Sequence, residues 1–303
     1  MIEQIDFHIS YRCPNKCIFC SSADVIARYR NRPLKIEDII AKIREKRGEG
    51  FKKINFTGGE PTVFTSFACL AKEAKRLGYR VYVGTNGGRF ADTKFCAGTA
   101  SFLDEVCFSC HGHTAALHDR LAASKGAFVR LTKAMDNLAG FPISFSSNTV
   151  ITRYNIDHLD KIMDILIGRK IKHILISNVA PEGRGLKNLS RIAVTLTKIR
   201  EKIPSLASIA DKNDTVVRFF GIPACILGDF ACRSNDFCWD TRLNIEQDND
   251  GRSFLKEEVC ALPVRGRIKT ARCRGCLYEH VCGGIFKAYF ERFGDDELNT
   301  VGK

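Results

Sequence analysis

Three cysteines near the N-terminus have a spacing that suits an iron–sulfur cluster. Cys13, Cys17 and Cys20 form a C-x3-C-x2-C pattern just after a short run of alternating apolar residues. Thiolates this close in sequence can wrap one face of a cubane cluster and bind three of its four irons. The fourth iron then has no protein ligand and is open to a bidentate small molecule. A structural zinc site needs four ligands, and the nearest fourth candidate, His8, points along the preceding strand.

A second group of cysteines lies in the last third of the chain. Its seven members are Cys225, Cys232, Cys238, Cys260, Cys273, Cys276 and Cys282. Cys273, Cys276 and Cys282 form C-x2-C-x5-C, a grouping typical of metal or iron–sulfur ligands, and the spacing leaves the fourth ligand open. The cysteines left over are interpreted either as a second, three-cysteine cluster with a site open to substrate or as buried thiols. A zinc ribbon is the less favoured reading, since ribbons usually pair two C-x2-C knuckles and only one is present.

Alternating strands and helices are predicted to position the first cysteine group. The predicted strands lie within residues 5–11, 53–56, 80–85, 105–110, 142–150 and 173–179, and helices between them within 36–47, 67–77, 128–138 and 156–167. Such alternation is typical of α/β proteins with a parallel sheet. A complete eight-unit barrel takes about 250 residues, so six units predict a partial (β/α)6 TIM-like barrel. We expect this barrel over residues 1–220 and a small cysteine-rich domain, stapled by metal, over 221–303.

Length and composition are those of a globular protein. The 303 residues are 45% hydrophobic and 27% charged, which excludes a disordered or fibrous chain. No apolar run is long enough to cross a bilayer, and the first residues lack the features of a signal peptide. The sequence therefore predicts a cytoplasmic protein without membrane contact, in which 14 cysteines stay reduced or bind metal. A net charge of +13 favours anionic partners such as an acidic peptide, a phosphorylated metabolite or RNA.

The remaining cysteines and a histidine group are not assigned to metal. Cys69, Cys96, Cys107 and Cys110 are expected in the core, with a hydrogen-donor role for Cys110 as a secondary possibility because it ends a strand. His111, His113 and His118 are expected to be surface or hydrogen-bonded groups.

The order of motifs along the first 190 residues resembles the radical S-adenosylmethionine (radical SAM) superfamily. After the cysteine triad come Gly58-Gly59-Glu60-Pro61, Thr85-Asn86-Gly87, Ser109 through His118-Asp119, Asn148-Thr149-Val150 and Pro181-Glu182-Gly183. The resemblance implies a 4Fe–4S cluster whose open iron is chelated by S-adenosylmethionine. Reductive cleavage of that cofactor would give a 5′-deoxyadenosyl radical that abstracts hydrogen from a substrate.

The same resemblance implies roles for the residues of these motifs. Gly58, Gly59 and Glu60 would meet the methionyl ammonium, and Asn148 the ribose, with Ser109 and Ser146 as weaker candidates. Phe19 would lie beside the adenine, and the backbone of Pro181 and Glu182 would face the base edge.

The second cysteine group resembles the auxiliary-cluster modules called SPASM, or Twitch in their shortened form. The two-cluster pattern has a further cysteine four residues after Cys282, where Phe286 stands in this chain. The departure favours a Twitch-like module with at least one auxiliary 4Fe–4S cluster. Cys225 matches the first ligand position of such modules and is favoured over Cys260 as the fourth ligand.

These features predict an enzyme that modifies a peptide or protein side chain and takes electrons from a donor such as flavodoxin or ferredoxin. The triad begins at Cys13, so no leader-binding domain is expected before the barrel. The same chemistry on a small anionic metabolite or on RNA is the alternative. An alternative of another class is a non-catalytic iron–sulfur electron-transfer protein.

Overall fold

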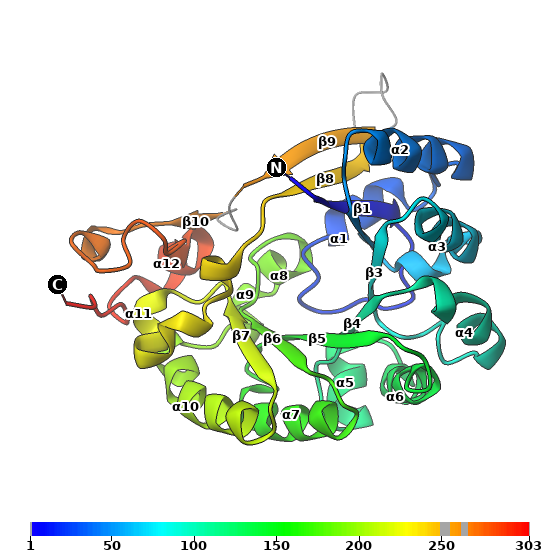
Figure 1. The fold of residues 1–303 in the computed structure, drawn as a ribbon. Helices are drawn as coiled ribbons and strands as arrows, with labels where there is room; N and C mark the ends of the chain where they lie inside the picture. The colour runs from blue at the N-terminus through cyan, green and yellow to red at the C-terminus, as the bar shows by residue number, and fades with distance from the viewer. Residues whose placement is uncertain (1, 249–254, 262–265, 303) are drawn as a thin grey trace.

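The computed structural model describes residues 2–248, 255–261 and 266–302. Its centre is a curved nine-stranded sheet with the spatial order β7-β6-β5-β4-β3-β2-β1-β8-β9 (Figure 1). Seven strands run parallel in chain order: β1 Gln4–Ser10, β2 Lys53–Gly58, β3 Arg80–Thr85, β4 Glu105–Ser109, β5 Ser144–Val150, β6 His173–Ser177 and β7 Val216–Phe220. The α/β class and the partial-barrel form are confirmed.

Alternation within the strands separates an outer apolar face from an inner polar one. In β1, Ile5, Phe7 and Ile9 are buried against the helices, because successive side chains of a strand point to opposite faces. The covering helices are α2 Ile36–Gly48, α3 Phe67–Arg76, α4 Thr93–Thr99, α5 Ala115–Ala122, α6 Ala127–Leu138, α7 Leu159–Gly168 and α10 Leu196–Lys212. Figure 1 shows them around the outside of the ring of strands. The inner faces are left free to line a cavity.

Six of the parallel strands are those predicted from the sequence, and three further strands of the nine-stranded sheet were not predicted. β7 adds a seventh parallel strand next to β6. β8 Arg242–Gln247 pairs in parallel with β1, and β9 Leu255–Cys260 pairs antiparallel with β8. Part of the segment expected in the C-terminal domain therefore extends the barrel sheet, because the open edge of β1 offers unpaired backbone groups. The division at residue 220 stays a prediction.

Residues 221–241 connect β7 to β8, which lie in opposite halves of the ring of strands. They form α11 Ala224–Leu227 and two 3-10 turns, η4 Gly228–Arg233 and η5 Asn235–Cys238. A single bridge between Phe219 and Ser234 fixes the path of this connection beside β7. The connection consequently passes the side of the barrel that the parallel strands leave open.

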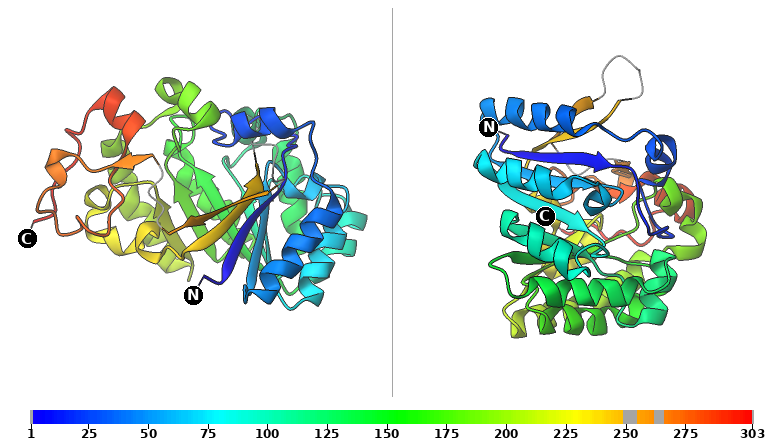
Figure 2. Two further views of the ribbon diagram at one scale, coloured as in Figure 1. Left: turned by 90° about the horizontal axis from the view of Figure 1, so that it is seen from above. Right: turned by 90° about the vertical axis from the view of Figure 1, so that its right-hand side faces the viewer.

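The C-terminal segment projects from one side of the barrel. It contains the short pair β10 Arg267–Ile268 and β11 Ile285–Phe286, followed by α12 Lys287–Phe293 (Figures 1 and 2). An ion pair between Arg267 and Asp236 of η5, with 2.7 Å between Nη1 and Oδ2, ties it to the barrel connection. Both side chains are almost fully buried. Within the described residues, no helix is both long and apolar enough to cross a bilayer.

Candidate functional site

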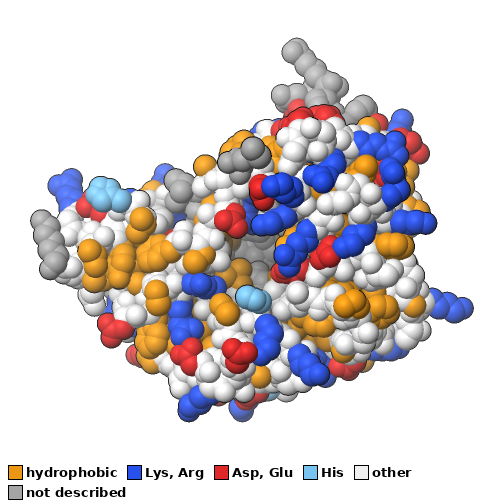
Figure 3. Space-filling view, viewed as in Figure 1, with side chains coloured by type: hydrophobic (Ala, Val, Ile, Leu, Met, Phe, Trp, Pro, Cys, Tyr) orange, Lys and Arg blue, Asp and Glu red, His pale blue; other side chains and the backbone are white. Residues whose placement is uncertain are grey.

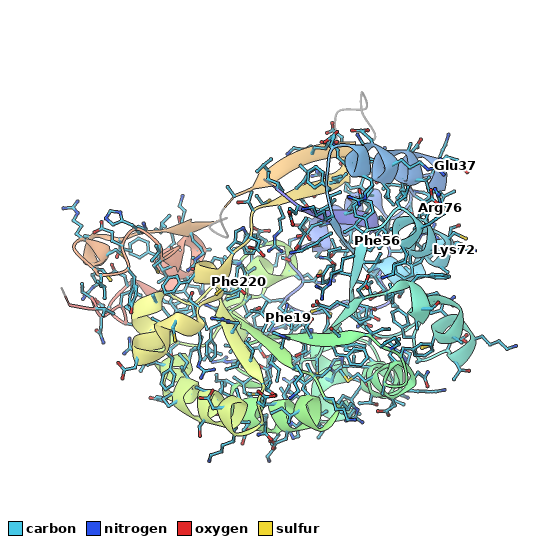
Figure 4. The ribbon with its side chains drawn as sticks, viewed as in Figure 1. Phe19, Glu37, Phe56, Lys72, Arg76 and Phe220 are labelled. Atoms are coloured by element: carbon cyan, nitrogen blue, oxygen red, sulfur yellow. The ribbon has the colours of Figure 1, made fainter. Side chains whose placement is uncertain are left out.

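An open cavity of about 660 Å³ lies inside the barrel. It is lined at one end by Cys13, Cys17 and Cys20, and further along by residues of β2 to β7 and of the connection to β8. Figure 4 shows Phe19 and Phe220, which come from different elements, toward the middle of the ring of strands, whereas Glu37, Lys72 and Arg76 lie on the outer helices. The cysteine triad thus opens onto a chamber large enough for a cofactor and part of a substrate.

The loop that carries the triad is held by backbone contacts from both flanks. Leu121 and Ala122, at the end of α5, accept hydrogen bonds from the N–H groups of Ile18 and Lys16. On the other flank is the short helix α8 Gly183–Lys187, where Arg184 donates from its backbone N–H to the carbonyl of Cys20 and from Nε to that of Cys17. The positions of the three thiols therefore depend on α5 and α8 as well as on β1.

The glycine pair after β2 allows a close backbone approach. Gly58 has φ +126°, and a Cβ there would lie 2.3 Å from the carbonyl oxygen of Ser10. A Cβ on Gly59 would lie 2.7 Å from the carbonyl oxygen of Arg12. The N–H of Gly59 instead donates to Ser10, and the N–H of Glu60 to Arg12. Glycine is required because this turn packs directly against the start of the cysteine loop.

Glu60 is fully buried and organises the ends of two strands. Its carboxylate accepts hydrogen bonds from the hydroxyls of Thr62 and Thr85 and from the backbone N–H groups of Thr62 and Asn86. Burial raises the pKa of Glu60, while these four donors favour the ionised form. The side chain of Asn86 in turn lies 3.8 Å from the sulfur of Cys13. Glu60 therefore couples β2 and β3 to the cysteine loop, in addition to lining the cavity.

The donor set suits an iron–sulfur cluster. Burial raises the pKa of Cys13 to about 11 and of Cys17 to about 12, and raises that of Cys20. Buried thiols are neutral at pH 7 without metal, so binding of iron must release protons. Three thiols of one loop lie at one end of the cavity, whereas the fourth lining cysteine, Cys107, belongs to strand β4, so the triad fits a cluster that keeps one iron for another ligand.

Most of the predicted cofactor contacts line the cavity, and three do not. Phe19, Gly58, Gly59, Glu60, Ser109 and Asn148 are lining residues. Ser109 and Asn148 are cross-strand neighbours, and Asn148 Oδ1 accepts a hydrogen bond from Ser177. Ser146 is not a lining residue and donates instead to Glu105. Pro181 and Glu182 are also outside the lining, which contains Ala180 of the same loop.

Two histidines that we expected to be surface or hydrogen-bonded groups are buried and hydrogen-bonded. His111 lines the cavity, and its ring meets that of Phe19 edge-on with 4.6 Å between the centroids. Nδ1 of His111 accepts from the N–H of Val150, which leaves the ring proton on Nε2. His118 Nδ1 accepts from the N–H of His111. Burial lowers the pKa of both rings, that of His118 to about 4, so both are neutral at pH 7.

The other unassigned cysteines divide between core, cavity and surface. Cys96 and Cys110 are buried, as expected, and Cys110 is not a lining residue of the cavity. Cys107 is half-buried and lines it. The expectation that Cys69 packs in the core is wrong, because its side chain is exposed on α3.

A second, small cavity brings four C-terminal cysteines together. Cys225, Cys273, Cys276 and Cys282 all line it, and Cys260 does not. The N–H groups of Ala224 and Gly284 point at the sulfur of Cys282, 3.4 and 3.3 Å away. Burial, and to a smaller extent the neighbouring thiols, raise the pKa of Cys225 to about 11. Four thiols with N–H donors around them suit a fully ligated cluster.

The leftover cysteines lie apart from this second cavity. Cys232 and Cys238 are exposed, so the buried-thiol reading fails for these two, and Cys260 is half-buried at the end of β9. Over the described ranges, no three His, Cys, Asp or Glu side chains converge on the position of one metal ion. Instead, the cysteines of the N-terminal triad line the central cavity together, and the four C-terminal cysteines line the small cavity together.

Sequence reasoning missed the contribution of the barrel connection to the central cavity. Asn235, Trp239 and Arg242 line it, although all three belong to the segment expected in the C-terminal domain. The one signal in the sequence was that Trp239 is the only tryptophan of the chain. Their distance in sequence from the triad gave no indication of contact with the same chamber.

Solved structures with a similar fold were found at low sequence identity. SuiB of Streptococcus suis bound to S-adenosylmethionine matches all of this chain and 76% of its own, with a TM-score of 0.67 and 15% identity. SuiB bound to precursor peptide SuiA has a TM-score of 0.59 at 17% identity, over 73% of this chain and 48% of its own, so the match spans about half of that protein. anSMEcpe with bound AdoMet and a peptide has a TM-score of 0.57 at 16% identity, over 71% and 63%. Because the sequence identities are only 15–17%, these matches show similarity of the fold alone.

A family model also matches the sequence itself. The model described as the radical SAM superfamily covers residues 7–166, more than half of the chain. The matched region includes the cysteine triad, the glycine turn after β2 and the strands up to β5. The chain belongs to the radical SAM superfamily.

Proposed function

We propose that this protein cleaves S-adenosylmethionine at a 4Fe–4S cluster held by Cys13, Cys17 and Cys20, and modifies a peptide or protein side chain with an auxiliary cluster beside it. The observation that carries the proposal is that the three cysteines, the glycine turn, Phe19 and Asn148 line one barrel cavity. An electron-transfer protein without a substrate has no need of such a chamber.

The cluster and S-adenosylmethionine, when bound, supply a 5′-deoxyadenosyl radical by one-electron reduction. The residues of the chain would bind the cluster and the cofactor, orient them, and enclose the chamber in which they lie. The three thiols would hold the cluster, the backbone at Gly58 and Gly59 would allow close approach of the cofactor, and Phe19 would offer an apolar ring to its base. The barrel strands surround the chamber and supply most of its wall.

The peptide substrate is supported by the structural neighbours. Two of them are structures with a bound peptide, the precursor SuiA in SuiB and a peptide in anSMEcpe. The alternative substrate, a small anionic metabolite or RNA, is supported by the net charge of +13 and by the similarity to methylornithine synthase, with a TM-score of 0.52. Basic side chains beside the central hollow of one face would favour any of these anions (Figure 3).

The auxiliary site is proposed to hold a fully ligated 4Fe–4S cluster on Cys225, Cys273, Cys276 and Cys282, in a SPASM/Twitch-like module. Its support is the shared cavity of these four residues. A cluster with all irons ligated by protein suits electron transfer rather than binding of S-adenosylmethionine. A flavodoxin or ferredoxin is proposed as the external electron donor.

The radical reaction is tested by product release. Protein reconstituted anaerobically with iron and sulfide, then mixed with dithionite and S-adenosylmethionine, is expected to release 5′-deoxyadenosine, measured by mass spectrometry. Cys17→Ala removes one of three ligands and should abolish release, whereas Cys69→Ala, which changes an exposed thiol on α3, should retain it. No product from the wild type under any reductant would overturn the proposal and favour the electron-transfer alternative.

The substrate class is tested by the salt dependence of binding. A short acidic peptide and tRNA are titrated against the reconstituted protein at two salt concentrations. Peptide binding with a shallow salt dependence supports the peptide proposal. Binding of tRNA alone, falling steeply with salt because phosphate contacts release counterions, would favour the RNA alternative.

A further inference from the structure

Three stacked side chains form one wall of the central cavity. Phe220 ends β7, and the ring of Trp239 stacks on it with 6.3 Å between centroids and 23° between planes. The guanidinium of Arg242, at the start of β8, lies 3.9 Å from the centroid of the Trp239 ring. All three residues line the cavity. The wall thus joins the last parallel strand to the strand that pairs with β1.

The wall is held in place from behind. Nε1 of Trp239 donates to the carbonyl of Cys260 on β9, which fixes the orientation of the indole. Nε of Arg242 donates to the carbonyl of Asp240, and Arg242 lies opposite Gln4 in the sheet register. A guanidinium stacked on an indole loses little side-chain freedom when it binds a ligand, because its plane is already oriented.

Arg242 retains unused hydrogen-bonding capacity toward the cavity. Its Nη1 lies 3.5 Å from Asp6 Oδ2, a long contact. The other oxygen of Asp6 already accepts from the side chains of Gln4 and Asn55. Nη2 of Arg242 has no partner among the described residues, and its side chain is 22% exposed.

The cavity lining contains little other charge. Arg242 is the one Lys or Arg among the lining residues that the structure describes, and the one carboxylate, Glu60, is occupied by four donors. The fork of a single guanidinium matches a carboxylate, whereas a doubly charged phosphate usually gathers several cationic or N–H donors. A carboxylate in the cavity would therefore find its cationic partner at Arg242.

We propose that the Phe220–Trp239–Arg242 wall is a substrate-binding subsite that receives a carboxylate group, with the apolar part of the same substrate packed on the two rings. For the peptide reading this group is an acidic side chain or a C-terminal carboxylate. The inference rests on the proposed function only in treating the cavity as the reaction chamber. The binding itself does not require the radical reaction.

The test uses Trp239 as the only tryptophan of the full-length, reconstituted protein. Acrylamide quenching of its fluorescence is measured with increasing glutarate, with the uncharged analogue glutaramide and with glycerol 2-phosphate. Glutarate is expected to lower the quenching constant at least twofold and saturably, and glutaramide to have no effect. Arg242→Gln should abolish the protection, and Arg242→Lys should weaken it because the fork is lost.

Arg120→Gln is the matched control variant. Arg120 also stacks over an aromatic ring, 3.9 Å from the centroid of Tyr154, but does not line the cavity. In this variant, glutarate should protect Trp239 from acrylamide quenching to the same extent as in the wild type. Equal protection by glutarate and glutaramide, unchanged protection in Arg242→Gln, or tighter binding of the phosphate would each overturn the proposal. Failure to release 5′-deoxyadenosine would instead overturn the proposed function and leave the carboxylate result standing.

Discussion

Gly183 shows how single residues determine the position of the cysteine loop. It has φ +53°, and a Cβ there would lie 2.5 Å from the carbonyl oxygen of Ser21 and 2.7 Å from that of Cys20. Gly228 has a similar φ of +57°, but a Cβ there would meet nothing within 4 Å. The two positions therefore separate the cost of the backbone conformation from the cost of pushing the loop away.

We predict that Gly183→Ala destabilises the protein more than Gly228→Ala. Both variants incur a positive φ that L-residues rarely adopt, which costs about 1–3 kcal/mol, and only Gly183→Ala also displaces the carbonyls next to Cys20. The measurement is the melting temperature together with the rate at which a chelator removes iron from the reconstituted protein. Iron loss as slow in Gly183→Ala as in Gly228→Ala would show that the close approach has no bearing on cluster retention.

His118 gives a pH-dependence that also belongs to the residue scale. Its pKa in the folded protein is lowered to about 4 by burial, while an unfolded chain binds the proton near pH 6.5. The unfolded state therefore binds more protons between these values, so stability falls as pH decreases from about 6.5 to about 4 and is not reduced further below that. The slope for one proton is about 1.4 kcal/mol per pH unit.

His118→Gln is expected to flatten this dependence by about one proton, because the amide does not titrate. Urea unfolding of the cluster-free protein at pH 5 and pH 7 measures the difference. His280→Gln, at an exposed position, serves as control and should keep the wild-type slope. An unchanged slope in His118→Gln would mean that this ring is not the group that titrates.

At the scale of elements, the buried ion pair between Asp236 and Arg267 joins the barrel connection to β10. Arg267 also donates to the carbonyl of Gly284, and a Cβ on Gly283 would lie 2.5 Å from its guanidinium. The C-terminal segment, which holds three of the four auxiliary cysteines, is therefore attached to the barrel connection through a buried ion pair. Removing one partner of a buried ion pair costs about 3–5 kcal/mol, because the buried charge that remains loses that counter-charge.

Asp236→Leu should accordingly release the C-terminal segment, detected as faster trypsin cleavage within residues 266–302 and loss of the auxiliary iron. The double variant Asp236→Leu/Arg267→Met should recover most of the resistance, because no unpaired charge stays buried. Equal cleavage of the single variant and the wild type would show that the packing around β11 and α12 is sufficient without the ion pair.

At the scale of the whole molecule, iron content distinguishes the two candidates for the fourth auxiliary ligand. Two cubane clusters predict about eight iron atoms per chain after reconstitution. Cys225→Ala should reduce this toward about four, since Cys225 lines the small cavity with the three C-x2-C-x5-C sulfurs. Cys260→Ala should retain about eight. Loss of iron in Cys260→Ala but not in Cys225→Ala would make Cys260 the fourth auxiliary ligand. About four iron atoms per chain in the wild type would show that the auxiliary cluster is absent.

Local patterns were sufficient for the fold class and for much of the candidate site. Strands β1 to β4 alternate buried apolar residues with less buried ones, and burial of one face makes that signal readable from sequence. β8 also alternates, with Leu243 and Ile245 buried, but no local feature tells which edge it joins. Ser146 shows the same limit within a strand, because its hydroxyl bonds Glu105 rather than facing the cavity.

The sequence by itself determined the chemistry of the chain, because ligand type and spacing are local: three thiols within eight residues, and a glycine pair where no Cβ fits. The tertiary structure alone decided which distant residues share a cavity. It brought Cys225 rather than Cys260 to the auxiliary cysteines, and Trp239 and Arg242 to the barrel interior. The place of Arg242 in the chamber depends on the pairing of β8 with β1 across more than 200 residues, and no local pattern encodes that pairing.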